Sequence, residues 1–93
     1  MMTLNSLASC AHALGHVRRL QIIERLAITP ATSAELCEAL GNIPFTSMRH
    51  HLQELINTGF VVCRHSGEQN MYTLVPAPLD ALCGQLGELF GGQ

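Results

Sequence analysis

The sequence predicts a single, mainly α-helical domain with one β-hairpin, in the order α-α-α-α-β-β-α. Three observations support this prediction. The chain has 93 residues, enough for one hydrophobic core and too few for two. Hydrophobic residues make up 47% of it, which excludes a solvated, disordered segment. Apolar residues recur at helical spacing along most of the chain, whereas the stretch 60–75 is rich in β-forming residues.

Two helices are expected in the first third of the chain. The first, over residues 4–14, follows a possible Thr3 cap and stops at Gly15. The second begins at Val17 and ends before Thr29-Pro30. It is amphipathic, with charged and amide side chains on one side and an apolar side formed by Leu20, Ile23, Leu26 and Ala27.

The next two helices have the spacing of a helix-turn-helix, over residues 33–58. Thr32 and Glu35 fit a capping box at the start of a short helix that Gly41 closes. Only residues 42–44 separate this helix from a longer one over 45–57. A short helix, a tight turn with glycine and a longer helix together form this motif.

A hairpin and a final helix complete the chain. Residues 60–65 and 70–75 are β-rich around a turn-like segment, which predicts a wing over 60–75. The last helix is expected over 78–90, where leucines recur at three- and four-residue steps. The domain is therefore predicted to span residues 1–93 as one winged helix-turn-helix.

Composition and charge narrow the class of protein. The chain has five arginines, no lysine and seven acidic residues. The resulting net charge of −2 excludes a strongly basic nucleic-acid-binding surface. No signal peptide and no apolar run of the ~18 residues that span a bilayer are visible. The four cysteines form no C-x-x-C pair. We therefore expect a cytoplasmic protein with reduced thiols and no membrane partner.

The helix over 45–57 carries the pattern that suggests DNA binding. Burying Met48, Leu52 and Leu55 leaves hydroxyl, imidazole and amide side chains on the opposite face, which can read base edges in a major groove. Arg49 lies on the flank, suited to a phosphate, and His51 falls near the core edge as a structural histidine. The residues predicted to contact DNA are Thr46, Ser47, Arg49, His50, Gln53 and Asn57 on this helix and Arg64, His65 and Gln69 on the wing. A solvated polar surface is the alternative interpretation.

The order and spacing of several short motifs resemble those of the ArsR/SmtB family of winged-helix repressors. Residues 13–23, ALGHVRRLQII, are similar to the family's A-L-x-H-P-x-R-L-x-I-L opening, and AELCEAL at 34–40 to its third helix. HLQEL at 51–55, TGFV at 58–61 and YTL at 72–74 resemble its recognition helix and wing.

The resemblance implies a homodimer built from the first and last helices and bound to double-stranded DNA at a palindromic operator, with its recognition helices in successive major grooves. The residues expected at the dimer interface are Leu4, Leu7, Ala11, Leu79, Leu82, Leu86 and Leu89.

The family's metal sites do not transfer to this chain. The two cysteine positions of its metal-binding motif hold Thr32 and Ala34, and the ligand positions on the last helix are occupied by prolines, a leucine and a glycine. None of these side chains binds zinc, so no metal and no cofactor are expected.

The cysteines are compatible with a thiol switch. Cys37 matches a cysteine of arsenic-responsive and thiol-switch members of the family, and Cys83 and Cys10 are its candidate partners. The alternative is that these cysteines are buried small hydrophobic residues. Cys63 on the wing is the thiol most expected to be exposed.

The favoured function is a sequence-specific transcriptional regulator, a homodimeric repressor with a possible redox, sulfur or arsenic signal. The alternative is a winged-helix protein-interaction module without DNA binding, as the missing lysines and net negative charge suggest. An enzyme is not expected, because the sequence shows neither a nucleophile–base–orienter pattern nor a Gly-rich phosphate loop.

Overall fold

The computed structural model describes residues 3–91 and confirms the predicted element order, with one additional short strand. Its helices and strands are α1 (Leu4–Leu14), α2 (Val17–Leu26), β1 (Ala31–Thr32), α3 (Ser33–Ala39), α4 (Phe45–Asn57), β2 (Val61–Ser66), β3 (Gln69–Leu74) and α5 (Pro76–Gly91). The last helix is longer at both ends than the predicted 78–90. In the described part of the chain, no helix is long and apolar enough to cross a membrane.

The additional strand turns the hairpin into a three-stranded antiparallel sheet with the order β1-β3-β2. β1 pairs with β3 through Ala31 opposite Tyr72 and Thr32 opposite Met71. The sheet therefore joins the loop before α3 to the inner strand of the wing. This pairing fixes the middle of the hairpin against the helix-turn-helix.

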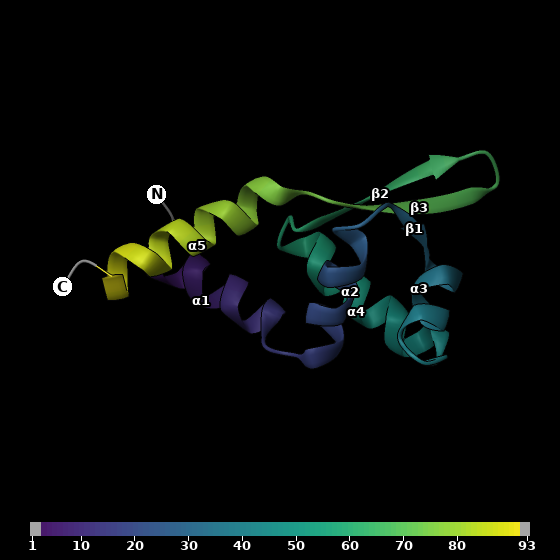
Figure 1. The fold of residues 1–93 in the computed structure, drawn as a ribbon, viewed down its shortest axis with the longest axis horizontal. Helices are drawn as coiled ribbons and strands as arrows, with labels where there is room; N and C mark the ends of the chain where they lie inside the picture. The colour runs from purple at the N-terminus through teal and green to yellow at the C-terminus, as the bar shows by residue number, and fades with distance from the viewer. Residues whose placement is uncertain (1–2, 92–93) are drawn as a thin grey trace.

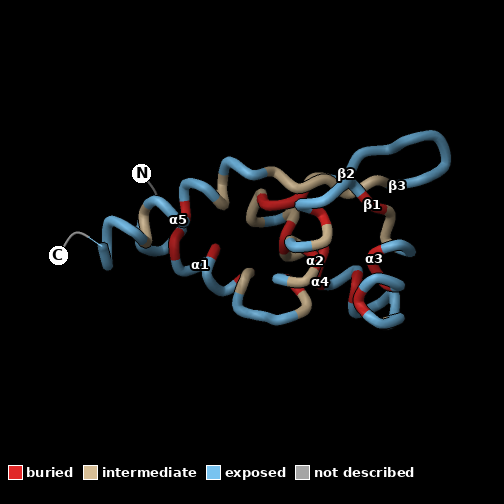
Figure 2. The backbone as a smooth tube through the Cα atoms, in the orientation of Figure 1, coloured by how far each residue is buried: buried red, intermediate tan, exposed pale blue. Residues whose placement is uncertain are grey.

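The core lies where α2, α3 and α4 meet the start of β2, and α1 and α5 add residues at one end. Figure 2 shows red, buried stretches on the inner sides of these helices and blue, exposed stretches between them. Met48, Leu52 and Leu55 of α4 are buried as predicted, each at most 2% exposed. Phe60 and Val61, at the start of the wing, are completely buried against them. One face of α4 is thus held in the core while the opposite face is free.

The prediction of which face of α2 is buried is partly wrong. Leu20 is 50% exposed and Ala27 is exposed, whereas Arg19 and Ile22 are buried beside Leu26. A buried arginine is rare unless its donors find partners, and Arg19 finds them in the interior. The face that α2 turns toward the core therefore differs from the face that hydrophobicity alone selects.

The predicted caps and the turn of the helix-turn-helix are present. Thr3 caps α1, and Thr32 and Glu35 form the reciprocal capping box at α3. The α3–α4 turn has Gly41 and Asn42 at φ +88° and +60°, and the amide of Asn42 donates to the Cys37 carbonyl at 2.8 Å. This Schellman-type end reverses the chain within three residues and sets α4 against α3.

The molecule is elongated, with extents of 48 × 24 × 22 Å. Its radius of gyration is 14.1 Å, against about 12 Å for a compact domain of this length. Figure 1 shows the reason: α1 and α5 lie at one end, and the hairpin projects from the other.

Candidate nucleic-acid interface

The outward face of α4 is the largest element of the candidate site. All six residues predicted on it, Thr46, Ser47, Arg49, His50, Gln53 and Asn57, are exposed. The Gln53 Nε2 atom donates to the Asn57 Oδ1 atom at 2.9 Å, which orders two amide side chains one helical turn apart. The face offers uncharged hydrogen-bonding groups with a cation at its edge, the chemistry that reads bases beside a phosphate backbone.

The N-terminal end of α4 lies beside a second arginine. Its N-cap, Pro44, makes no side-chain cap hydrogen bond, so the first-turn amides are not capped by a side chain. A cleft of about 280 Å³ at this end is lined in part by His16, Arg18 and Ser47. Arg18 is held there because its Nη1 atom donates to the Leu40 carbonyl at 3.0 Å and to Gln21 at 3.3 Å. The helix dipole and the guanidinium both favour an anion at this end.

The three predicted wing residues are also exposed. Arg64 and His65 lie on β2 and Gln69 begins β3, with His65 opposite Asn70 in the register. Gly67 supplies the positive φ of the turn, +65°. These residues belong to the half of the hairpin nearest its turn, and Figure 1 shows that this end projects beyond the helices.

A cleft of about 410 Å³ lies between α4 and the wing. It is lined by Ser33, Phe45, Arg49, Leu52, Asn70 and Tyr72. Ser33, Phe45 and Tyr72 were not predicted as site residues, because none lies on the polar stripe of α4 or near the hairpin tip. Burial raises the pKa of the Tyr72 hydroxyl, and the neighbouring Cys63 raises it further. The hydroxyl is therefore a neutral hydrogen-bonding group.

A buried polar link connects α4 to the N-terminal helices. The Arg19 Nε atom donates to the His51 Nδ1 atom at 3.3 Å, and its Nη1 atom donates to the carbonyls of Ala13 at 3.2 Å and His12 at 3.5 Å. The His51 ring lies 4.4 Å from the His16 ring. Burial, and then electrostatic interactions with His16 and Arg19, lower the pKa of His51. His51 is therefore a structural histidine, as predicted, and it is held neutral.

The cysteines divide into two groups. Cys10 and Cys37 are buried, whereas Cys63 and Cys83 are exposed, which places Cys63 as predicted. Burial raises the pKa of the Cys37 thiol, and a thiol that stays protonated is a poor nucleophile. Across residues 3–91, no three His, Cys, Asp or Glu side chains group in a way that could hold a metal ion.

The residues predicted at the dimer interface do not form one exposed surface. Leu7 and Leu82 are buried in the core of their own chain, and Leu79 and Leu86 pack partly against it. Leu4, Ala11 and Leu89 are exposed. The structure adds Phe90, 74% exposed, to the apolar side chains at this end.

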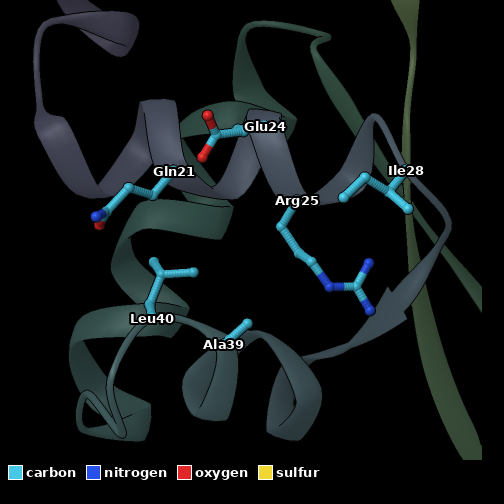
Figure 3. A pocket seen from close by; sticks show the side chains of 6 residues that line it. All are labelled: Gln21, Glu24, Arg25, Ile28, Ala39 and Leu40. Atoms are coloured by element: carbon cyan, nitrogen blue, oxygen red, sulfur yellow. The ribbon is translucent and has the colours of Figure 1, made fainter.

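Figure 3 shows a further pocket, of about 260 Å³, between α2 and α3. Its lining residues are Gln21, Glu24, Arg25, Ile28, Ala39 and Leu40. The Arg25 Nη1 atom donates to the Thr29 carbonyl at 3.1 Å. The pocket includes none of the exposed residues of α4.

Comparisons with known proteins identify the fold. No family model and no curated protein matches the chain. Solved structures match it along most of its length: an ArsR-like transcriptional regulator from Rhodococcus sp. RHA1 has a TM-score of 0.84 at 23% identity, covering 95% of this chain and 82% of that one.

The chain has the fold of the ArsR-family regulators. The homodimeric winged helix-turn-helix DNA-binding domain of Mb0332 from Mycobacterium bovis, described as a possible ArsR-family regulator, has a TM-score of 0.76 at 26% identity, covering 96% and 81% of the two chains. Reduced HlyU from Vibrio cholerae N16961 has a TM-score of 0.75 at 26% identity, covering 92% and 90%. The ArsR-like resemblance predicted from the sequence motifs is thus confirmed at the level of structure.

Proposed function

We propose that the chain is a homodimeric, sequence-specific DNA-binding transcriptional regulator that acts as a repressor. One observation carries the proposal: the six predicted residues of α4 are all exposed, while the opposite face of that helix is buried in the core. Such a helix is rigidly held and presents groups that can read bases. The fold shared with a homodimeric DNA-binding domain supports the same function.

In the proposed complex, α4 lies in the major groove. Gln53, ordered by Asn57, offers its amide to a base edge, for which adenine is the matched partner. Arg49 binds a backbone phosphate from the flank, and Arg18 binds another beside the first turn of α4. Arg64, His65 and Gln69 on the wing contact the backbone or the minor groove. With so few cations, the salt dependence of binding is expected to be shallow.

The proposed dimer forms through α1 and α5. Leu82 is the one buried residue among the described residues of α5, although this helix runs for 16 residues. Leu89 and Phe90 near its end, and Leu4 on α1, remain exposed. A second copy of the chain would cover these side chains and place two α4 helices about one DNA turn apart on a palindromic operator.

The thiol signal, in this proposal, acts through Cys83. Of the three candidate thiols, Cys83 is the exposed one, whereas Cys10 and Cys37 serve as small buried side chains. Mild oxidation is expected to weaken DNA binding of the wild-type protein but not of Cys83→Ser, as measured by a gel-shift titration. Cys63→Ser is the matched control, since Cys63 is also exposed. If Cys83→Ser remains as sensitive as the wild type, Cys83 is not the sensing residue.

Two substitutions test the DNA-binding function. Gln53→Ala is expected to weaken binding to the DNA upstream of the gene for this chain by about 1–3 kcal/mol for each half-site while leaving binding to scrambled DNA unaffected, because it removes one base contact per subunit. Arg49→Ala is expected to weaken binding to both DNAs and to reduce the salt slope by about 1.8, because it removes one phosphate contact from each subunit of the dimer. Fluorescence anisotropy over a range of salt concentrations measures both effects.

Arg25→Ala is the matched arginine control, since Arg25 lies on α2 and lines the separate pocket of Figure 3. It is expected to change neither affinity nor salt slope. The alternative function, a protein-interaction module, is favoured by the net charge of −2 and the absence of lysine. That function predicts that all three variants behave alike.

A further inference from the structure

Phe45 is a large apolar side chain in an unusual place. It is the first residue of α4 and is 63% exposed. The other large hydrophobic residues exposed within residues 3–91 lie on α1, on α5, or on α2 and the turn that follows it, and they are Leu4, Val17, Leu20, Ile28, Leu89 and Phe90. Phe45 is thus the large exposed apolar residue of the helix that the proposed function places in the major groove.

The fold itself does not explain a phenylalanine at this position. Phe45 belongs neither to the buried core cluster nor to the hydrophobic residues packed against it. The first position of a helix accepts many residue types, and polar ones would cost less in water. An aromatic ring left in solvent gains free energy when a partner covers it.

The surroundings of Phe45 indicate the kind of partner. Arg49 lies one helical turn farther along α4, and both residues line the cleft between α4 and the wing. Asn70 and the Ser33 hydroxyl line the same cleft. The ring therefore lies among a cation and neutral hydrogen-bonding groups, which suits an apolar spot within a polar, anionic partner. Duplex DNA has such a spot in its major groove, the C5 methyl group of thymine.

We propose, building on the DNA-binding function above, that Phe45 is a specificity-determining residue that packs against a thymine C5 methyl group in each half-site. The N-terminal residues of a recognition helix are the ones that reach base edges, and Phe45 is the first residue of α4. Arg49, held to a phosphate beside it, fixes the depth at which the ring enters. The contact selects thymine over cytosine, which lacks this methyl group.

The size of the effect follows from the methyl group. Covering one methyl group is expected to tighten binding about fourfold, and two half-sites together about fifteenfold. Replacing thymine by uracil removes that methyl group and leaves the Watson–Crick pairing unchanged. The chemistry of the contact can therefore be tested without knowing the operator sequence in advance.

The DNA upstream of the gene for this chain is amplified twice, once with thymidine triphosphate and once with deoxyuridine triphosphate in its place. Gel-shift titrations then compare the two DNAs. Wild-type protein is expected to bind the uracil DNA about fifteenfold more weakly. Phe45→Ala is expected to bind both DNAs equally, at about the wild-type affinity for uracil DNA. Phe45→Leu, which keeps an apolar side chain, is expected to retain part of the preference.

Each other outcome overturns the inference in a distinct way. If the wild type binds both DNAs equally, there is no methyl contact. If Phe45→Ala keeps both the wild-type affinity and the full preference for thymine, another side chain reads the methyl group. If Phe45→Ala binds more weakly but keeps that preference, the ring contacts a sugar instead. If the wild type binds neither DNA better than a scrambled duplex, the DNA-binding function itself fails. Circular dichroism checks that the variants are folded.

Discussion

Replacing Arg19 with alanine is expected to lower the free energy of unfolding by about 3 kcal/mol. Arg19 is only 6% exposed, and it donates to His51 on α4 and to the carbonyls of His12 and Ala13 at the end of α1. Truncation leaves the buried His51 and Ala13 acceptors without this donor, whereas the His12 carbonyl keeps the Gly15 amide, and it opens a cavity between α1, α2 and α4. The helix that carries the proposed DNA-binding face would lose its link to the N-terminal helices.

Urea denaturation of the wild-type and Arg19→Ala proteins measures this loss of unfolding free energy. Arg25→Ala is the control, because the Arg25 side chain donates to the Thr29 carbonyl at an exposed site, and its loss is expected to change stability by less than about 0.5 kcal/mol. An Arg19→Ala protein as stable as the Arg25→Ala protein would show that the buried link contributes nothing.

The same link makes stability depend on pH. Burial, His16, Arg19, His50 and Arg18 all lower the pKa of His51 in the folded state below its ordinary value of 6.5. The unfolded chain therefore takes up a proton at this residue that the folded chain does not. The stabilising contribution is complete above pH 6.5 and is lost as the pH falls below it.

Unfolding free energies measured between pH 7.5 and 5.5 are expected to decline less steeply for His51→Gln than for the wild type. Gln53→Ala, altered at an exposed residue without a titratable group, is expected to keep the wild-type slope. Equal slopes for the wild type and His51→Gln would contradict this assignment.

The second large effect is expected from Leu89→Glu on α5. Leu89 is 48% exposed in the isolated subunit, so a glutamate there leaves the subunit's core intact. In the proposed dimer the carboxylate would be buried at the interface without a partner, and the dimer would dissociate. Because two linked recognition helices bind far more tightly than one, affinity for the upstream DNA is expected to fall by about a hundredfold or more.

Sedimentation equilibrium and gel-shift titration measure the two consequences of this substitution. Ile28→Glu is the matched control, since Ile28 is 79% exposed and follows α2, outside the proposed interface. It is expected to leave both the dimer and DNA binding unchanged. A Leu89→Glu protein that remains dimeric would exclude this end of α5 from the interface.

The sequence was most informative where a local signal sets the structure. The capping box of Thr32 and Glu35, the positive φ of Gly41 and the apolar stripe of α4 all act within a few residues, and each is observed. The exposed face of α4 followed from that stripe alone. Its proposed contacts with DNA stay predictions, because no partner is present.

The features that the sequence did not predict depend on contacts between distant residues. β1 has two residues and exists because Ala31 and Thr32 pair with β3, about 40 positions away in the sequence. The buried face of α2 is set by the acceptors that Arg19 finds on α1 and α4, which helical periodicity does not reveal. Phe45 is an apolar residue at a helix start, and only its exposure in the folded chain distinguishes it.

The division of the leucines at the proposed interface has the same origin. The apolar stripes of α1 and α5 cover the chain's own core with Leu7 and Leu82, and their remaining members are exposed at the end of the molecule. Hydrophobic spacing marks both sets in the same way. Only the packing of the subunit shows which side chains remain for a second copy.

The most direct test of the central claim is an anisotropy titration of the reduced wild-type protein against its own upstream DNA and a scrambled duplex of the same length. A dimeric regulator predicts saturable binding to the upstream DNA, with an affinity at least about a thousandfold above that for the scrambled duplex at the same salt concentration. Equal, weak binding to both duplexes would contradict the claim and favour the protein-interaction module.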